Sequence, residues 1–265
     1  MPALTTGDVM LNYQIDGPCG ARRTVLLAHS LASTLRMWTP QIPALVAAGF
    51  RVVRYDGRGH GLSSAPPGPY ALAELAGDAL ALMDALALER VDFCGLSLGG
   101  MVGQYLGTHH GLRLRTLTLC ATAACIGPRE IWDQRLATVR AQGMAGVADG
   151  TIVRWFTAES RATRTEDVAQ VRAQVMSTPV EGYCGCCAAI RDMDQRESIR
   201  GIAVPTQIIV GAEDPSTPVS ASALIHERIA GSTLRIIPAA QHFVNVEQAP
   251  AFNAALLGFL NAHPA

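Results

Sequence analysis

Short runs of consecutive apolar residues alternate along this chain with longer segments in which apolar residues recur every three or four positions. A short unbroken apolar run is typical of a strand buried on both faces, and the three-to-four spacing is typical of a helix with one buried side. The clearest helical spacing covers residues 72–88. Strand–helix alternation of this kind predicts an α/β fold, a mostly parallel sheet with helices on both faces. The runs that we expect to form strands are residues 24–28, 51–55, 91–94, 114–120, 206–210 and 233–237.

One long segment interrupts this alternation. Residues 126–200 contain no strand-like run, and their apolar residues recur at helical spacing from Trp132 onward. A run of helices between two strands of a parallel sheet reads as an insertion that covers the ends of the strands. We therefore predict two parts, a core made of residues 1–125 and 201–265 and a helical lid made of residues 126–200.

Composition limits the chemistry of the chain. With 265 residues, of which 49% are hydrophobic and 16% charged, the chain is long enough to bury one large core. Its net charge of −1 argues against nucleic acid as the main partner, since phosphate binding requires a basic face. All 21 basic residues are arginine, which excludes Schiff-base chemistry, lysine-anchored pyridoxal phosphate and a P-loop.

Several features predict a cytoplasmic protein without a membrane segment. The stretch from Met1 to Asp8 lacks the basic start and apolar core of a signal peptide, and no apolar stretch is long enough to span a bilayer. The seven cysteines are an odd number and are scattered, as expected of free thiols in a reducing compartment. The cluster Cys184-Gly185-Cys186-Cys187 has no second cysteine or histidine pair near it in sequence, so we predict no metal site.

The stretch "DFCGLSLGG" at residues 92–100 places one serine among glycines, where a predicted strand gives way to a helical pattern. Gly95 precedes Ser97 by two positions and Gly99 follows it by two. A sharp strand-to-helix turn presses these two neighbours against adjacent backbone, so only small residues fit. The turn also brings the Leu98 N–H to the positive end of the helix. We predict that Ser97 is a nucleophile and that Leu98 supplies half of an oxyanion hole.

A serine nucleophile requires a base, and the base requires an orienting group. His242 follows the last predicted strand, and Asp214 follows the strand before it. Loops at the C-terminal ends of parallel strands open on the same edge of the sheet as the serine turn. We therefore predict a catalytic triad of Ser97, Asp214 and His242, with Glu213 as an alternative acid and His60 as an alternative base.

The second oxyanion donor should come from the loop after an early strand. Leu31 lies in the loop that follows residues 24–28, and we assign its backbone N–H beside that of Leu98. His29 lies in the same loop, and we expect it to brace the loop rather than to act in catalysis.

Taken together, these residues resemble the α/β-hydrolase superfamily along nearly the whole chain. The order serine, acid, histidine is the order in which that superfamily carries its triad. More narrowly, the sequence is similar to the 3-oxoadipate enol-lactonases of aromatic catabolism. The resemblance implies cofactor-free hydrolysis of the enol-lactone to 3-oxoadipate through an acyl-serine. The stretches that carry it are "HSLASTLRMWTPQ", "FRVVRYDGRGHGLSSAPPGPY", "FCGLSLGGMVGQYLG", "LTLCATAACIG" and "CCAAIRDMDQRESI".

A substrate of this kind carries a free carboxylate. A cation under the lid would hold that carboxylate, and in a chain without lysine the cation must be an arginine. Arg135, Arg140 and Arg154 flank the lid aromatics Trp132 and Trp155, so we expect these residues to bind substrate. The alternative for each arginine is a place on a solvated face of a helix.

Two departures from the family pattern touch the pocket. Ala32 stands where a glycine is expected after the oxyanion leucine, and Phe243 and Val244 replace small polar residues beside the histidine.

The same triad would also serve a general carboxylesterase or a carbon–carbon bond hydrolase. A ligand-sensing protein of this fold would instead turn over slowly and recruit a partner through its lid. A homo-oligomer is compatible with each of these functions.

Overall fold

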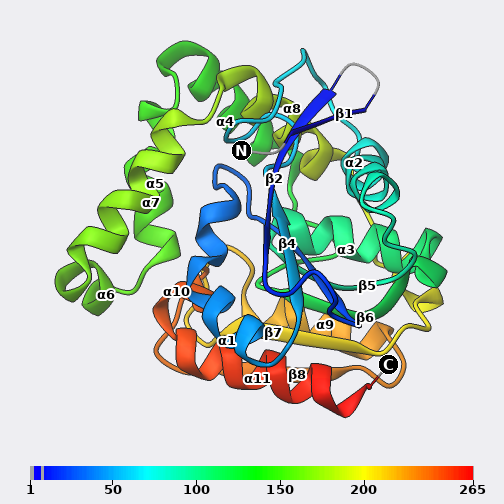
Figure 1. The fold of residues 1–265 in the computed structure, drawn as a ribbon. Helices are drawn as coiled ribbons and strands as arrows, with labels where there is room; N and C mark the ends of the chain where they lie inside the picture. Colours follow the sequence, from blue (N-terminus) through cyan, green and yellow to red (C-terminus); the bar gives the residue numbers. More distant parts are fainter. Residues whose placement is uncertain (1–2, 7–8, 265) are drawn as a thin grey trace.

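The computed structural model describes residues 3–6 and 9–264, which form an eight-stranded sheet flanked by helices (Figure 1). Met1, Pro2, Gly7 and Asp8 of the N-terminal stretch lie outside the described residues. The strands are β1 (Ala3–Thr6), β2 (Val9–Asp16), β3 (Thr24–Ala28), β4 (Arg51–Tyr55), β5 (Val91–Leu96), β6 (Leu114–Cys120), β7 (Thr206–Gly211) and β8 (Thr233–Ile237). They lie in the order β1-β2-β4-β3-β5-β6-β7-β8. The strands from β3 to β8 run parallel, whereas β2 pairs antiparallel with both β1 and β4.

The predicted α/β class with a mostly parallel sheet is confirmed. Each predicted strand begins at the residue where a strand of the parallel sheet begins. All residues of β5 and β7 are buried, as expected for strands covered by helices on both faces. Sequence reasoning missed β1 and β2, because β2 mixes buried and exposed positions without a continuous apolar run.

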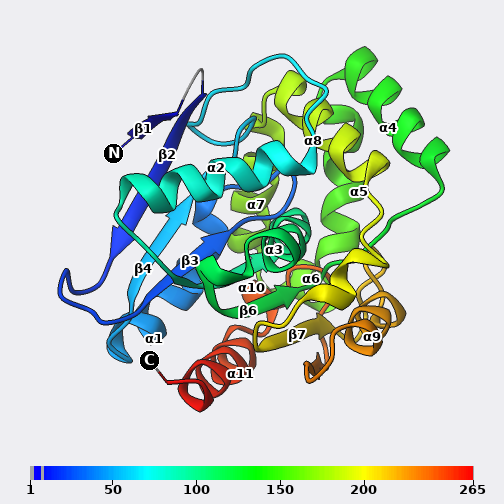
Figure 2. The same ribbon diagram turned by 90° about the vertical axis from the view of Figure 1, so that its right-hand side faces the viewer.

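Helices outside the predicted lid cover both faces of the sheet. Helices α2 and α3 pack against each other on one face, and α1 and α11 lie on the other (Figures 1 and 2). The predicted helix over residues 72–88 ends earlier, at Ala85. The helices are α1 (Ile42–Ala47), α2 (Leu72–Ala85), α3 (Leu98–His109), α9 (Val219–Arg228), α10 (Val244–Glu247) and α11 (Ala249–Ala262), with short 3-10 helices η1 (Leu35–Gln41), η2 (Gly111–Arg113) and η3 (Ser198–Gly201).

A group of helices occupies the connection between β6 and β7. Residues 121–205 are all described and contain no strand. Figure 1 shows these helices, in green to yellow, gathered on one side of the sheet. Helix α4 packs against α8, and α5 packs against α7. The helices are α4 (Arg129–Gln142), α5 (Ala145–Trp155), α6 (Ala158–Thr163), α7 (Thr165–Ser177) and α8 (Val180–Asp192).

The parallel strands set the place of the site. Because β3 to β8 share one direction, the loops that follow them open at one edge of the sheet. Ser97 follows β5 directly, while Asp214 follows β7 and His242 follows β8. Among the described residues, no helix combines the length and the apolar character needed to cross a membrane.

Candidate active site

Ser97 sits in a strained turn between β5 and α3. Its backbone has φ 57° and ψ −112°, a region that non-glycine residues rarely adopt and that the surrounding structure must enforce. Neighbouring groups hold the turn from both sides, because the Ser97 N–H donates to the Cys120 carbonyl at 2.9 Å and the Thr122 hydroxyl donates to the Ser97 carbonyl at 2.8 Å. The serine is therefore fixed by its backbone at the start of a helix.

The glycines on either side of Ser97 are required by close backbone approaches. A Cβ on Gly95 would lie 2.1 Å from the Gly99 carbonyl oxygen, and a Cβ on Gly99 would lie 2.2 Å from the Ala28 carbonyl oxygen. Neither contact is sterically possible without moving the backbone. The G-x-S-x-G spacing thus reflects the steric demand that we inferred from the sequence.

A buried histidine and a buried carboxylate meet beside this turn. His242 Nδ1–H donates to Asp214 Oδ2 at 2.8 Å, and both side chains are almost fully buried. Ser97 and His242 line the same cavity. Glu213, the alternative acid, is exposed, so the structure brings Asp214 and not Glu213 to the histidine.

Asp214 accepts several hydrogen bonds besides the one from His242. The Ser216 N–H and Thr217 N–H donate to its Oδ1 at 2.8 and 3.1 Å, and the Thr217 hydroxyl donates to its Oδ2 at 2.8 Å. Burial raises the pKa of Asp214, but the charge of His242 and these hydrogen bonds lower it more, so the net pKa lies below its usual value. Sequence reasoning missed Thr217, although an aspartate followed by Pro-Ser-Thr is typical of a side-chain-capped turn.

His60, the alternative base, is engaged elsewhere. Its Nε2 accepts a hydrogen bond from the Ala32 N–H at 2.9 Å, and its Nδ1 donates to the Arg58 carbonyl at 3.2 Å. Both ring nitrogens are therefore occupied by backbone groups, which leaves neither nitrogen for Ser97. Among the residues that the structure describes, His29 hydrogen-bonds only to backbone groups, as expected of a side chain that braces the loop.

The two predicted oxyanion donors flank the serine. Leu98 is the first residue of α3, where backbone N–H groups have no acceptor within the helix. Leu31 lines the cavity of Ser97. Within residues 3–6 and 9–264, the N–H of neither leucine donates to a protein acceptor. The Leu98 N–H at the positive end of α3 and the Leu31 N–H in the cavity wall suit a developing negative charge.

A cavity of about 460 Å³ opens above these groups. Trp132 and Arg135 of α4 and Arg154 and Trp155 of α5 lie in its wall, so four of the five residues that we expected to bind substrate do face the site. Tyr183 of α8 was not predicted and also lines it. The other lining residues are Ser30, Leu31, Ala32, Ser97, Met101, Ile126, Gly127, Ile131, Thr151, Ile190, Pro215, Ser216, Thr217 and His242.

The two cavity arginines carry charge without a carboxylate partner among the described residues. An Arg135 N–H donates to the Tyr183 hydroxyl at 3.4 Å, and its guanidinium lies 5.2 Å from the centre of the Trp132 ring. An Arg154 N–H donates to the Thr151 hydroxyl at 3.3 Å. Burial lowers the pKa of Arg154, and the charge of Arg135 lowers it further. Two guanidinium charges in the wall of one cavity, neither paired with a carboxylate of the described residues, would be stabilised by a bound anion.

Arg140 is the exception, and the prediction that it faces the pocket is wrong. It is exposed and lines a separate groove with Asp133, Glu181 and Arg191. The reason is helical geometry, since a residue five positions after Arg135 on α4 points about 140° away around the helix axis.

The residues around His242 join the loop after β8 to the helices above it. The Phe243 N–H donates to the Trp155 carbonyl at 3.1 Å, and the Phe243 and Trp155 rings stack with centroids 4.2 Å apart. Glu247 accepts hydrogen bonds from the Gln241 N–H and the Thr157 N–H at 2.6 and 2.8 Å. Phe243 and Val244 are buried away from the cavity wall, so they support the histidine loop and the aromatic wall from behind.

The cysteine cluster on α8 belongs to the packing of that helix. Cys184, Cys186 and Cys187 are free and buried, and Cys186 Sγ–H donates to the Arg58 carbonyl at 3.8 Å. In the part of the chain that the structure describes, no group of three histidine, cysteine, aspartate or glutamate side chains is arranged to hold a metal ion.

Known proteins are similar to this chain in sequence and in fold. A family model described as the alpha/beta hydrolase fold matches residues 23–249. The chain is 38% identical over 253 residues to one 3-oxoadipate enol-lactonase of Acinetobacter baylyi, covering 96% of this chain and 94% of that relative. It is 34% identical to a second enol-lactonase of the same organism, covering 95% and 93%. The crystal structure of the enol-lactonase from Burkholderia xenovorans LB400 matches with a TM-score of 0.96 at 39% identity, covering 98% of this chain and 100% of that one.

Proposed function

Because this chain belongs to the α/β-hydrolase fold family and is similar in sequence to 3-oxoadipate enol-lactonases, we propose that it hydrolyses 3-oxoadipate enol-lactone to 3-oxoadipate without a cofactor. The observation that carries the proposal is the pair Arg135 and Arg154 in the wall of the cavity that also contains Ser97 and His242. A lactone with a free carboxylate offers one group for the nucleophile and one for the arginines.

The first half of the reaction forms an acyl-serine. Ser97 Oγ attacks the lactone carbonyl carbon while His242 Nε2 takes the hydroxyl proton. Asp214 fixes the imidazole tautomer through Nδ1 and stabilises the imidazolium that forms. The carbonyl oxygen becomes an oxyanion between the N–H groups of Leu31 and Leu98, each contributing about 3 kcal/mol to lowering the barrier.

Collapse of this intermediate opens the ring. The bond between the carbonyl carbon and the ring oxygen breaks, and His242 returns its proton to the departing enol oxygen. The enol then tautomerises to the ketone, while the acyl group stays on Ser97. Water, deprotonated by His242, attacks the acyl-serine and releases the second carboxylate.

The helical segment of residues 126–200 supplies the pocket walls in this proposal. Trp132, Arg135, Arg154 and Trp155 all come from it, which supports its role as a lid over the core formed by residues 1–125 and 201–265. A covered cavity excludes water and strengthens the pairing of a carboxylate with a guanidinium. The cytoplasmic location and a homo-oligomeric state stay predictions.

Steady-state hydrolysis of three substrates tests the proposal. Wild-type protein should turn over the enol-lactone with a far higher kcat/KM than p-nitrophenyl acetate or a vinylogous diketone. Ser97→Ala should abolish hydrolysis and leave the thermal unfolding temperature nearly unchanged, since removal of one hydroxyl leaves almost no cavity. Retention of more than a few per cent of the rate in a pure Ser97→Ala preparation would remove the nucleophile assignment.

The same experiment separates the alternatives. Preference for the neutral ester would indicate a general carboxylesterase, and preference for the diketone a carbon–carbon bond hydrolase. Turnover that stops after about one event would indicate a sensing protein.

A further inference from the structure

The turn that carries Leu31 adopts a backbone conformation that its sequence does not favour. The Ser33 N–H donates to the Ser30 carbonyl at 3.1 Å, which closes the turn, and Ala32 inside it has φ 57°. Glycine is the usual residue at such a left-handed position, because a Cβ is crowded there. A turn with alanine at this position depends on contacts from outside to hold it.

His60 makes that contact. Its Nε2 accepts the Ala32 N–H, and its Nδ1 faces the Arg58 carbonyl. Because a carbonyl only accepts, the proton of the ring lies on Nδ1, which leaves Nε2 as the acceptor. The ring is fully buried; burial, and after it the charge of nearby His29, lower the pKa of His60 to about 3. The acceptor therefore stays unprotonated at neutral pH.

His29 makes the reciprocal contact between the same two loops. It lies in the Leu31 loop, and its Nε2 accepts the Gly57 N–H at 2.8 Å, while its Nδ1 donates to the Ser30 carbonyl at 2.7 Å. The two imidazole rings meet edge to face, with centroids 4.9 Å apart. Each loop thus offers one histidine acceptor to a backbone N–H of the other.

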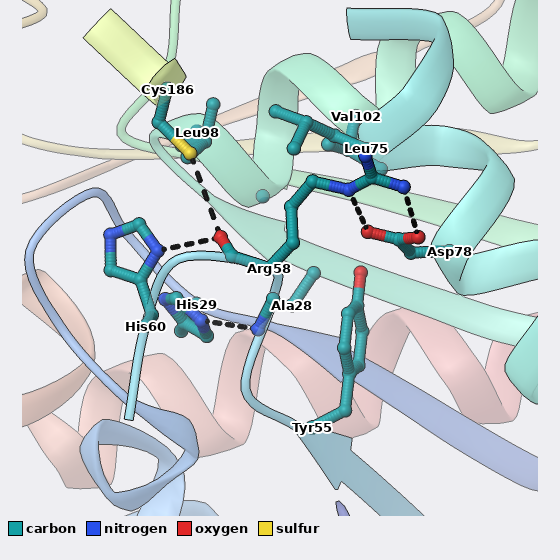
Figure 3. A pocket seen from close by; sticks show the side chains of 12 residues that line it. Ala28, His29, Tyr55, Arg58, His60, Leu75, Asp78, Leu98, Val102 and Cys186 are labelled. Carbon is teal, nitrogen blue, oxygen red and sulfur yellow. Dashed lines mark hydrogen bonds and ion pairs between the residues drawn. The ribbon is translucent and has the colours of Figure 1, made fainter. Parts of the chain in front are cut away.

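The loop that carries His60 is held in place by contacts with two helices. Figure 3 shows the Arg58 carbonyl accepting from both the His60 ring and the Cys186 thiol of α8. The Arg58 side chain forms two hydrogen bonds of 2.7 Å with the Asp78 carboxylate of α2 (Figure 3). His60 is therefore a rigid support, and it connects the Leu31 turn to α2 of the core and to α8 of the lid.

We propose that His60 is a positioning residue of the oxyanion hole, which holds the Ala32 N–H and thereby keeps the adjacent Leu31 N–H aimed at the reacting carbonyl. The inference rests on the proposed function, in which Leu31 is an oxyanion donor. Such a donor acts on the charge that develops in the transition state. Loss of the hold should therefore lower kcat with little change in KM.

Three substitutions at His60 test the role of its acceptor. His60→Leu removes the acceptor at similar volume and should lower kcat by about 10- to 100-fold, less than or equal to the loss of a whole donor. His60→Gln can place an oxygen near the Nε2 position and should keep kcat within about tenfold of wild type. If His60→Leu does not fold, His60→Asn replaces it, because its shorter side chain does not reach the Ala32 N–H.

Ser63→Ala is the matched control. The Ser63 hydroxyl donates to the Asp56 carbonyl at 2.6 Å and accepts from the Asn12 N–H at 2.9 Å, so its loss removes buried hydrogen bonds of the same loop without touching the Leu31 turn. This control should lower the unfolding temperature and leave kcat within about twofold. In the double variant Ala32→Gly/His60→Leu, kcat should recover several-fold over His60→Leu, because glycine adopts the left-handed conformation without strain.

Both p-nitrophenyl acetate and the enol-lactone serve as substrates, because the ester uses the oxyanion hole without requiring recognition of a carboxylate. Equal fold losses on both substrates are expected. The inference is overturned if His60→Leu, or His60→Asn in its place, keeps kcat within twofold or matches His60→Gln. It is also overturned if, in His60→Leu, kcat/KM no longer rises with pH as a histidine loses its proton, since His60 would then be the base. A wild-type protein that hydrolyses the ester but not the lactone would refute the proposed function and leave this test intact.

Discussion

Exchange of the cavity arginines for methionine should separate recognition of the substrate's charge from the chemistry at Ser97. Methionine keeps the unbranched apolar stem of the side chain and removes the guanidinium. We expect Arg135→Met and Arg154→Met to lower kcat/KM for the enol-lactone, because each leaves the substrate carboxylate with one cation instead of two. Turnover of p-nitrophenyl acetate should stay close to wild type, since that ester has no carboxylate.

The size of the effect follows from the environment of the pair. Truncation of one partner of a buried, hydrogen-bonded charge pair costs about 2–5 kcal/mol. Both arginines are only half-buried, and the remaining arginine still holds the carboxylate, so we expect about 1.4–2.8 kcal/mol, or roughly 10- to 100-fold. The double variant should lose more than either single variant, but the losses should not add, because both arginines act on one carboxylate and the charge of Arg135 disfavours that of Arg154.

Arg140→Met is the matched control for this experiment. Arg140 lies on the same helix as Arg135 but outside the cavity, so its exchange should leave both substrates unaffected. The assay is steady-state hydrolysis of both substrates by all variants at low and moderate salt. If every variant changes kcat/KM by the same factor for both substrates, the arginines do not bind the carboxylate, and hydrolysis of neutral esters becomes the better account of the function.

Three further outcomes follow from the site. Asp214→Asn should lower kcat by about 10⁴-fold, because the amide disturbs the histidine tautomer. Thr217→Val leaves the hydrogen bond from His242 to Asp214 in place and should lower kcat only about tenfold. Equal losses of kcat in the two variants would contradict this ranking. Gly99→Ala should destabilise the fold and abolish activity, since its Cβ would collide with backbone, and a stable, active variant in a thermal melt and ester assay would refute that packing argument. The free energy of unfolding of the wild type should fall as pH drops below about 6.5, because His60 takes up a proton near that pH in the unfolded chain, whereas burial lowers its pKa to about 3 in the folded protein. Urea titrations at pH 7.5 and pH 5 should show a smaller loss of stability in His60→Gln than in the wild type. An equal loss would show that His60 does not titrate in this way.

Local features of the sequence were sufficient for the parallel strands and for the strand-to-helix turn at Ser97. Strands β3, β5 and β7 are buried along their whole length because helices cover both faces of the sheet, and the apolar-rich runs that form them are visible without knowledge of their neighbours. Ser97 could be predicted because the steric demand of its turn falls on residues two positions away. Strand direction puts the loops after β7 and β8 at one edge of the sheet, which brought Asp214 and His242 together but did not separate Asp214 from Glu213.

Other features depend on contacts between segments that are far apart in the chain, and no local pattern carries them. Arg140 and Arg135 lie on one helix in similar sequence surroundings, and only the packing of α4 decides which arginine faces the cavity. The Ala32 turn looks like a departure from the family pattern until His60, 28 residues away, is seen to hold it. Hydrophobic period and turn chemistry act over a few residues, so the parallel strands and the serine turn could be predicted from short stretches of sequence. Hydrogen bonds and charges act between atoms a few ångströms apart, so the polar side chains that meet around the strands and the serine turn could be identified only once distant segments were placed side by side in the fold.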